Sequence, residues 1–274
     1  MLGFMDFYSD LCYNVNTKLQ RMLKMTKWIW NGEIAFAWEE LSKFVIKKCD
    51  EFTKTMLETT SFSPNEKSKT LISAECLERY KNLTQLLSEG MKDYPYYYCG
   101  DLGDNLQNAK KLNSWILLGS LTESTLQIFL AFYMEDYQNT KWQLWDNFKI
   151  EETLQPIIKF IDDDLIGKGE LSSKQGKSIK KAVKEVIKKH TVQHDIKKIM
   201  LDELIQLFRK LELFDDNDFN YLEKIKANRN AIHSFENREI DSWEELHYCI
   251  HFLCYLMEWV LFRLPDIPDE AYFY

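Results

Sequence analysis

Hydrophobic residues recur at helical spacing in the N-terminal part of the chain. The stretch KWIWNGEIAFAWEELSKFVIKKCDEF, residues 27–52, places them three or four positions apart, and we predict helical structure up to about residue 60. The polar, proline-containing TTSFSPNEKSKT interrupts this pattern, and a second helix is predicted over 72–91. The segment KDYPYYYCGDLGDN, residues 92–105, combines a proline with two glycines, so we place a domain border at 104/105.

The pattern after this border is also helical. The segment KKLNSWILLGSLTESTLQIFLAFYMEDY is apolar nearly all round between Trp115 and Tyr133, with Glu123 as its one charge, as expected for the central helix of a bundle. Further helices are predicted near 150–161, 176–190, 195–211, after the DDND sequence at 215–218, and over 243–264, where Ser242 and Glu245 form a capping box. We therefore predict an all-α fold, in which residues 1–104 form an N-terminal helical extension and residues 105–274 form a helical bundle.

Composition and charge narrow the classes of function. The 274 residues include nine glycines and five prolines, and 45% are hydrophobic, which is typical of a helical globular protein. The net charge of −8 excludes nucleic-acid binding through bulk charge, but ten lysines and three acids lie between residues 168 and 198. This basic segment is either a solvated helix surface or an RNA-binding surface, and for the second case the candidate substrate-binding residues are Lys177, Lys180, Lys181 and Lys184.

Cysteine spacing and hydropathy bear on the compartment. The six cysteines include no CxxC pair, and the N-terminus has no basic segment followed by an apolar run, so we expect reduced thiols and a cytoplasmic protein. The apolar stretch at 246–264 contains two histidines, a glutamate and an arginine, so we expect a buried core helix and no membrane association.

Several short motifs lack the context that their chemistry requires. The string GELSSKQGKS at 169–178 ends like a phosphate loop, but six residues instead of four separate its glycines and no apolar strand precedes it. The pair His247/His251 has no acid or thiol that clearly shares its helical face, so packing is expected there, and we interpret the pair His190/His194, which lies beside Asp195, in the same way. We therefore expect no metal site and no cofactor.

The sequence KANRNAIHSF, residues 226–235, contains the strongest candidate for chemistry. On a helix, Phe219, Leu222 and Ile225 form one apolar stripe, and Arg229 projects into the middle of it with His233 one turn further on. A buried arginine must be paired, hydrogen-bonded or placed along a cleft, and Glu123 is the candidate partner.

The residues ANRNAIHSFENREI, followed by a long aromatic helix that ends RLPDIP, resemble the signature of HEPN (higher eukaryotes and prokaryotes nucleotide-binding) domains. The segment WILLGSLTESTLQIFLAFY is similar to the first bundle helix of that family, and the resemblance covers roughly residues 105–268. It implies an all-α bundle that forms a homodimer and binds RNA. Many HEPN proteins are metal-independent endoribonucleases of host defence or toxin systems, so an antitoxin or another regulatory partner is also implied.

The resemblance assigns roles to three residues. His233 would transfer protons, Arg229 would stabilise negative charge on the phosphate, and Asn230 would orient either group. The chain departs from the family pattern, because three residues separate Arg229 from His233 where four to six are usual, and because Phe235 stands where some HEPN toxins have a modified tyrosine. The alternative is a catalytically inactive HEPN module that binds RNA or protein, in which Arg229 and His233 only tie the bundle together.

Overall fold

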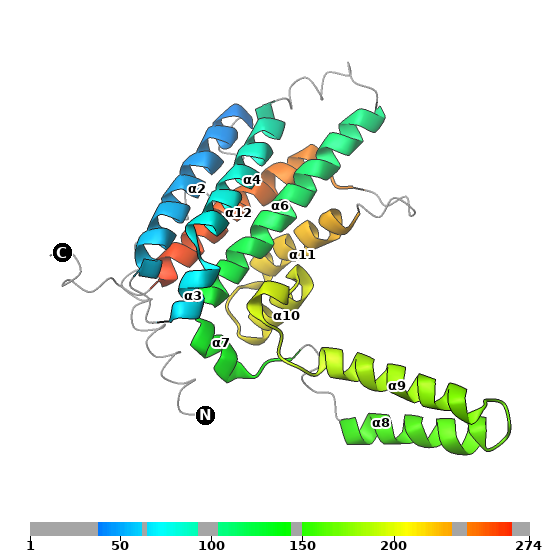
Figure 1. Cartoon of the computed structure of the whole chain (residues 1–274). Helices are drawn as coiled ribbons and strands as arrows, with labels where there is room; N and C mark the ends of the chain where they lie inside the picture. The colour runs from blue at the N-terminus through cyan, green and yellow to red at the C-terminus, as the bar shows by residue number, and fades with distance from the viewer. Residues whose placement is uncertain (1–37, 62–64, 93–103, 144–149, 232–239, 265–274) are drawn as a thin grey trace. The chain divides into compact units, whose positions relative to one another are not determined.

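The described residues of the computed structural model form helices connected by short turns. They are residues 38–61, 65–92, 104–143, 150–231 and 240–264, and within them the predicted all-α fold is confirmed (Figure 1). The chain divides into two compact units, of which unit 1 comprises Met1–Tyr133 and Met200–Tyr274, and unit 2 comprises Met134–Ile199. The helices of unit 1 are α2 (Trp38–Ser61), α3 (Glu66–Leu71), α4 (Ala74–Lys92), α6 (Asp104–Phe132), α10 (Leu201–Lys210), α11 (Asp216–Asn230) and α12 (Trp243–Arg263).

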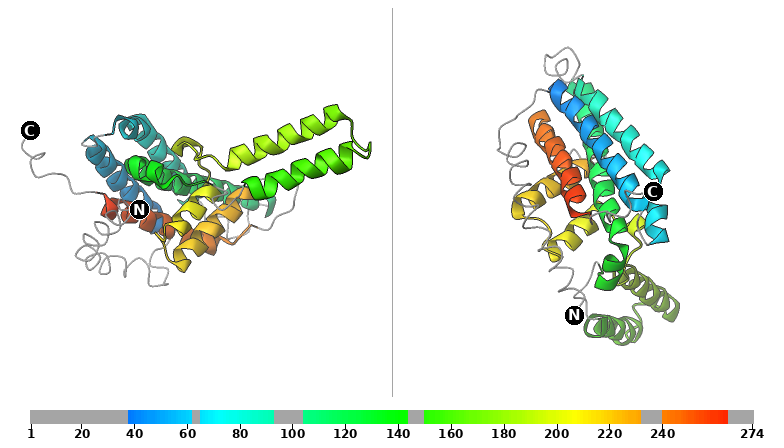
Figure 2. Two further views of the ribbon diagram at one scale, coloured as in Figure 1. Left: turned by 90° about the horizontal axis from the view of Figure 1, so that it is seen from below. Right: turned by 90° about the vertical axis from the view of Figure 1, so that its left-hand side faces the viewer.

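Helix α6 is the central helix of unit 1. It packs against α3, α4, α10, α11 and α12, while α2 packs against α4 and α12. Figures 1 and 2 show α2, α4, α6 and α12 lying side by side along most of their lengths. A helix that contacts neighbours on several sides has little surface for a polar face, which explains why α6 is apolar nearly all round from Trp115 onwards.

Large aromatic side chains fill the core of unit 1 where α6, α10 and α12 meet. The Phe129 ring of α6 lies with its centroid 4.9 Å from that of Trp259 and 5.8 Å from that of Phe208. Phe214 adds a fourth ring, 4.6 Å from Trp259. All four side chains are at most 9% exposed, so this cluster removes a large apolar area from water.

The capping residues in the sequence correctly predicted where α11 and α12 begin. The side chain of Asp215 accepts the backbone N–H of Asp218 at the start of α11, and Ser242 does the same for Glu245 at the start of α12. The helix predicted over 195–211 is instead a 3₁₀ turn, Ile196–Lys198, followed by α10, which begins at Leu201.

The predicted domain border at 104/105 does not separate the two units. Helices α2 and α4 precede that border, yet they pack with α6 and α12 inside unit 1, and the chain crosses between units after Tyr133 and after Ile199. The physical reason is that α4 packs against α6, and the buried Tyr80 hydroxyl of α4 is hydrogen-bonded to Thr125 Oγ1 of α6 at 2.7 Å.

Unit 2 contains a helical hairpin. The elements of unit 2 are α7 (Met134–Thr140), α8 (Ile150–Lys159), a π-helical continuation at Phe160–Ile166, α9 (Ser173–His190) and the 3₁₀ turn. The hairpin has two long arms, of which the first is α8 with its π-helical continuation and the second is α9. They lie side by side in opposite directions (Figures 1 and 2). Gly169 turns the chain between them with a φ of +78°, a conformation that L side chains rarely adopt.

The start of α9 explains the sequence that ends like a phosphate loop. Ser172 and Gln175 form a capping box, and Gly176 lies within α9, where an added Cβ would come within 2.3 Å of Ile166 Cδ1. These residues therefore start a helix and allow close packing of the two arms.

Hydrogen bonds connect the first and last parts of unit 2. The Tyr137 hydroxyl of α7 donates to the carbonyl of His194 at 2.7 Å, and Gln193 Nε2 donates to the carbonyl of Tyr137 at 2.7 Å. The chain segments that enter and leave the unit are thus held next to each other.

Long apolar helices lie within unit 1. Of the described residues, only Leu106–Phe132 of α6 is long and apolar enough to span a membrane by length and composition, and 61% of its most apolar window is buried. The predicted core role of residues 246–264 is confirmed, because α12 buries thirteen side chains.

Candidate functional site

Arg229 lies in the last turn of α11, on the side that faces α6. The predicted stripe is present, since Phe219, Leu222 and Ile225 are buried. Arg229 Nη1 donates to Glu123 Oε2 at 2.5 Å, so the partner suggested by the sequence is the partner in the structure. The side chains of Arg229 and Glu123 are 23% and 16% exposed, which leaves part of the pair accessible to solvent.

Gly119 makes room for the Arg229 side chain. It lies one helical turn before Glu123 on α6, and a Cβ added there would come within 2.6 Å of Arg229 Cδ and 3.0 Å of Arg229 Cβ and Cγ. Such contacts are too short for carbon atoms, so a side chain at residue 119 would displace the arginine. The sequence reasoning missed Gly119, although its i, i+4 spacing from the lone acid of α6 was a usable signal.

Glu123 also stabilises the start of α10. Its Oε2 accepts the backbone N–H of Leu201 at 2.8 Å, while the N-cap residue Met200 makes no side-chain capping bond. A carboxylate at a helix N-terminus satisfies a free N–H group and interacts favourably with the helix dipole. Through this one oxygen, Glu123 connects α6, α10 and α11.

Asn228 was not singled out from the sequence, yet it fixes the chain on either side of residues 232–239. It is 4% exposed, its Nδ2 donates to Asp241 Oδ2 at 2.8 Å, and its Oδ1 accepts the Asp241 N–H at 2.8 Å. Lys111 of α6 donates to the neighbouring carbonyl of Ile240 at 3.4 Å. The available signal was a polar residue three positions after Ile225 on the buried stripe.

The other two predicted catalytic residues differ in what the structure describes. Asn230 is exposed and is the last residue of α11, adjacent to Arg229. His233 lies outside the described residues, as does Phe235. Because α11 ends at Asn230, the predicted placement of His233 one turn further along the same helix stays a prediction.

The four predicted substrate-binding lysines belong to unit 2, whereas Arg229 belongs to unit 1. Lys177, Lys180, Lys181 and Lys184 all lie on α9 and line one surface groove. The structure thus brings the lysines together with one another, and Arg229 together with Glu123.

Two buried titratable groups of unit 1 lie apart from this pair. Burial, with Asp215 nearby, raises the pKa of Asp218 to about 6, and its Oδ2 accepts the Tyr255 hydroxyl at 3.5 Å. Burial and the neighbouring His247 lower the pKa of His251 to about 4. His247 and His251 are core side chains of α12, with ring centroids 4.9 Å apart. Within the described ranges, no group of three or more His, Cys, Asp or Glu side chains is arranged to hold a metal ion.

Comparison of the chain with protein-family models, with curated proteins and with solved structures gives no match.

Proposed function

We propose that this protein is a metal-independent endoribonuclease of HEPN type, with Arg229, Asn230 and His233 as its catalytic residues and Glu123 as the residue that positions Arg229. The observation that carries the proposal is the paired but partly exposed Arg229 at the end of α11. A purely solvated arginine would have no reason to lie on the buried stripe, and a purely structural one would not need to keep its side chain 23% exposed. Asn230, next to it, presents an amide to solvent.

The proposed chemistry needs no metal ion. The RNA 2′-OH is the nucleophile, and its oxygen attacks the adjacent phosphorus while the P–O5′ bond breaks, which leaves a 2′,3′-cyclic phosphate and a 5′-hydroxyl. His233 takes the proton of the 2′-OH or returns a proton to the leaving oxygen. Arg229 stabilises the charge on the phosphate oxygens with its permanent positive charge.

Glu123 is suited to holding Arg229 in place for this task. A charge-assisted hydrogen bond at 2.5 Å fixes the direction of the guanidinium, and the contact with Gly119 limits where the aliphatic part can lie. An arginine restrained before substrate binds loses less conformational entropy on binding a phosphate.

The proposed assembly is a homodimer, in which two copies of the site act on one RNA, as the resemblance implies. A role in host defence or as a toxin, with an antitoxin or other regulatory partner, belongs to the same proposal. These features rest on the resemblance of residues 105–268.

A second candidate function is a catalytically inactive HEPN module that binds RNA or protein. The observation that favours it is the double role of Glu123 Oε2, which holds both Arg229 and the N-terminus of α10. An arginine needed only to complete this network would contribute to stability and not to catalysis.

The test is cleavage of end-labelled RNA in the presence of a chelator by wild type and by the variants Arg229→Ala, Asn230→Ala and His233→Ala. Arg79→Ala is a matched control, because Arg79 is an exposed arginine of α4, with 72% side-chain exposure. We expect cyclic-phosphate ends from wild type and the control, and a loss of about 10²-fold or more for the first and third variants.

Thermal melting of each variant separates the two candidate functions. A folded His233→Ala protein without cleavage supports catalysis. No cleavage by wild type, together with a large drop in melting temperature on Arg229→Ala, contradicts the nuclease and supports the binding module.

A further inference from the structure

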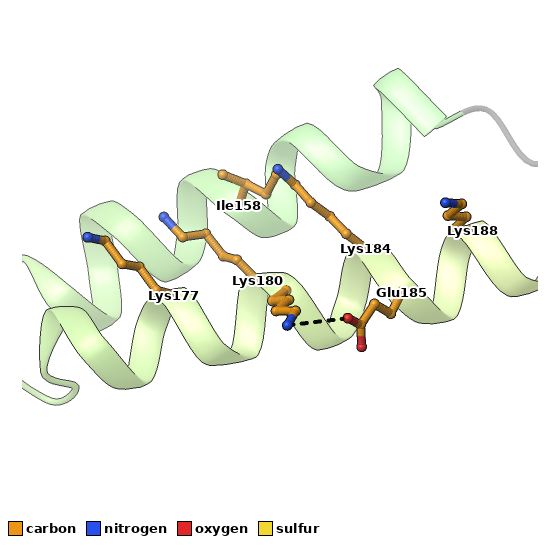
Figure 3. A pocket seen from close by; sticks show the side chains of 7 residues that line it. Ile158, Lys177, Lys180, Lys184, Glu185 and Lys188 are labelled. Atoms are coloured by element: carbon orange, nitrogen blue, oxygen red, sulfur yellow. Dashed lines mark ion pairs between the residues drawn. The ribbon is translucent and has the colours of Figure 1, made fainter.

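A surface groove of about 470 Å³ lies along the hairpin of unit 2. Its lining contains five lysines of α9, together with Ile158 of α8 and one acid, Glu185. Figure 3 shows the side chains of Lys177, Lys180 and Lys184 extending from α9 towards α8, the helix that contains Ile158. The described lining of the groove is therefore mostly basic, and its apolar side chain is Ile158.

The positive charge of the groove is concentrated on one helix. Helix α9 contains seven lysines and one glutamate, so it carries a charge of +6 in a chain whose net charge is −8. At about 100° per residue, six of these lysines fall within roughly 120° of the helix circumference. They are Lys174, Lys177, Lys180, Lys181, Lys184 and Lys188. Placing like charges this close is unfavourable unless acids or a bound anion compensate it.

Acids compensate only part of this charge. Lys180 pairs with Asp162 at 2.6 Å, and Lys181 pairs with Glu185 at 3.8 Å. Within the part of the chain that the structure describes, Lys177, Lys184 and Lys188 have no ion pair. Three ammonium groups thus line a concave surface and remain available to an anion.

We propose that this groove binds the phosphate backbone of an RNA strand without reading its bases. The choice of RNA rests on the proposed ribonuclease function, whereas the preference for a polyanion rests on the groove. A row of lysines along a helix suits a polymer with regularly repeated charges. Among the residues that the structure describes, the lining includes no arginine, no aromatic ring and no amide side chain, which are the groups that recognise or stack on bases.

A local basic groove would allow an acidic protein to bind RNA. The overall charge of −8 repels a nucleic acid, so attraction must come from a local surface, and the groove is a concentrated positive surface of this chain. Unit 2 then holds the strand through its backbone, while the sequence or structure that is cut is selected elsewhere.

The experiment measures binding of a short fluorescent 2′-O-methyl RNA, which cannot form a cyclic phosphate, by anisotropy over a range of salt concentrations. The groove variant is Lys177→Gln/Lys184→Gln/Lys188→Gln. The matched control is Lys43→Gln/Lys47→Gln/Lys54→Gln on α2, which removes the same charge from lysines whose side chains are 72% to 76% exposed.

We expect the groove variant to bind at least tenfold more weakly and to reduce the slope of log K against log salt by about two, since each phosphate contact on a single strand contributes roughly 0.7. The control variant should keep the wild-type slope. Equal losses in both variants, or none in the groove variant, would overturn the proposal, as would binding of wild type to anionic vesicles but not to RNA.

The same assay distinguishes this proposal from the proposed activity. If wild type binds the uncleavable RNA through the groove but cleaves no substrate, the groove proposal stands and the nuclease proposal fails. If wild type cleaves and the groove variant binds as tightly as wild type does, only the groove proposal fails.

Discussion

The contact between Gly119 and Arg229 predicts the effect of one added methyl group. Replacing glycine with alanine inside a helix normally stabilises it by about 1 kcal/mol, because glycine loses more backbone entropy on folding. At Gly119 the new Cβ would come within 2.6 Å of Arg229 Cδ, on a helix that is packed on several sides. The arginine must then move, and the hydrogen bond to Glu123 is strained or lost.

The magnitude follows from three contributions to the free energy of unfolding. Overpacking costs about 1–3 kcal/mol. Loss of a hydrogen bond between charged groups costs about 1.5–3 kcal/mol, and the lower end of this range applies to a partly exposed pair. The higher helix propensity of alanine returns about 1 kcal/mol. We expect Gly119→Ala to destabilise unit 1 by about 2 kcal/mol, which lowers its melting temperature by roughly 4–8 °C for a domain of this size.

The assay is thermal and urea unfolding of Gly119→Ala, Arg229→Ala and the double variant. Gly90→Ala is a suitable control, since Gly90 also lies in a helix, and its added Cβ would meet only Ser114 Oγ at 3.3 Å. Once Arg229 is truncated beyond Cβ, most of the steric conflict is removed, so Gly119→Ala should cost much less in that background. Stabilisation of the wild type by Gly119→Ala, or an equal cost with and without the arginine side chain, would refute this prediction.

Three further substitutions test other parts of unit 1. Burial raises the pKa of Asp218 to about 6, so the folded state holds a proton that the unfolded state has released, and stability falls as pH rises from about 4 to 6. The free energy of unfolding of Asp218→Asn should therefore be roughly 2–3 kcal/mol higher than that of wild type above about pH 6 and equal to it near pH 4. Urea unfolding at both pH values measures this difference. The pKa of His251 is lowered to about 4, so the unfolded state binds a proton between about pH 6.5 and pH 4 that folded His251 does not bind, which opposes the effect of Asp218 in wild type. The free energy of unfolding of His251→Gln, measured by calorimetry, should therefore rise relative to that of wild type by roughly 3 kcal/mol as pH falls from about 6.5 to 4. Asn228→Ala should lower the free energy of unfolding by roughly 2–3 kcal/mol in urea titrations, because it leaves Asp241 without two hydrogen bonds; a cost below about 0.5 kcal/mol would contradict this role.

Features that depend on local chemistry were predictable from the sequence. Asp215 and Ser242 cap the helices that they were expected to start, since a capping side chain acts on residues two or three positions away. The pairing of Glu123 with Arg229 was also predictable, because each is a charge on an otherwise apolar helical surface.

Features that depend on how helices pack were not predictable in this way. The close approach of Gly119 to Arg229 arises only because α11 lies against α6, and the spacing of Gly119 from Glu123 does not by itself specify that contact. The division into units was missed for a similar reason. Apolar faces of α2 and α4 show that these helices are buried, but not that they are buried with α6 and α12.

The hydrogen bonds from Tyr137 and Gln193 give unit 2 the architecture of a domain insertion. Because they hold the entering and leaving segments together, residues 134–199 are joined to the rest of the chain at two neighbouring points. Insertions are tolerated at such places, since the host fold has only to bridge a short gap. We therefore expect a deletion protein in which a short flexible linker replaces unit 2 to keep the helices of unit 1. The hairpin could then be lengthened, exchanged or removed while the fold of unit 1 is kept.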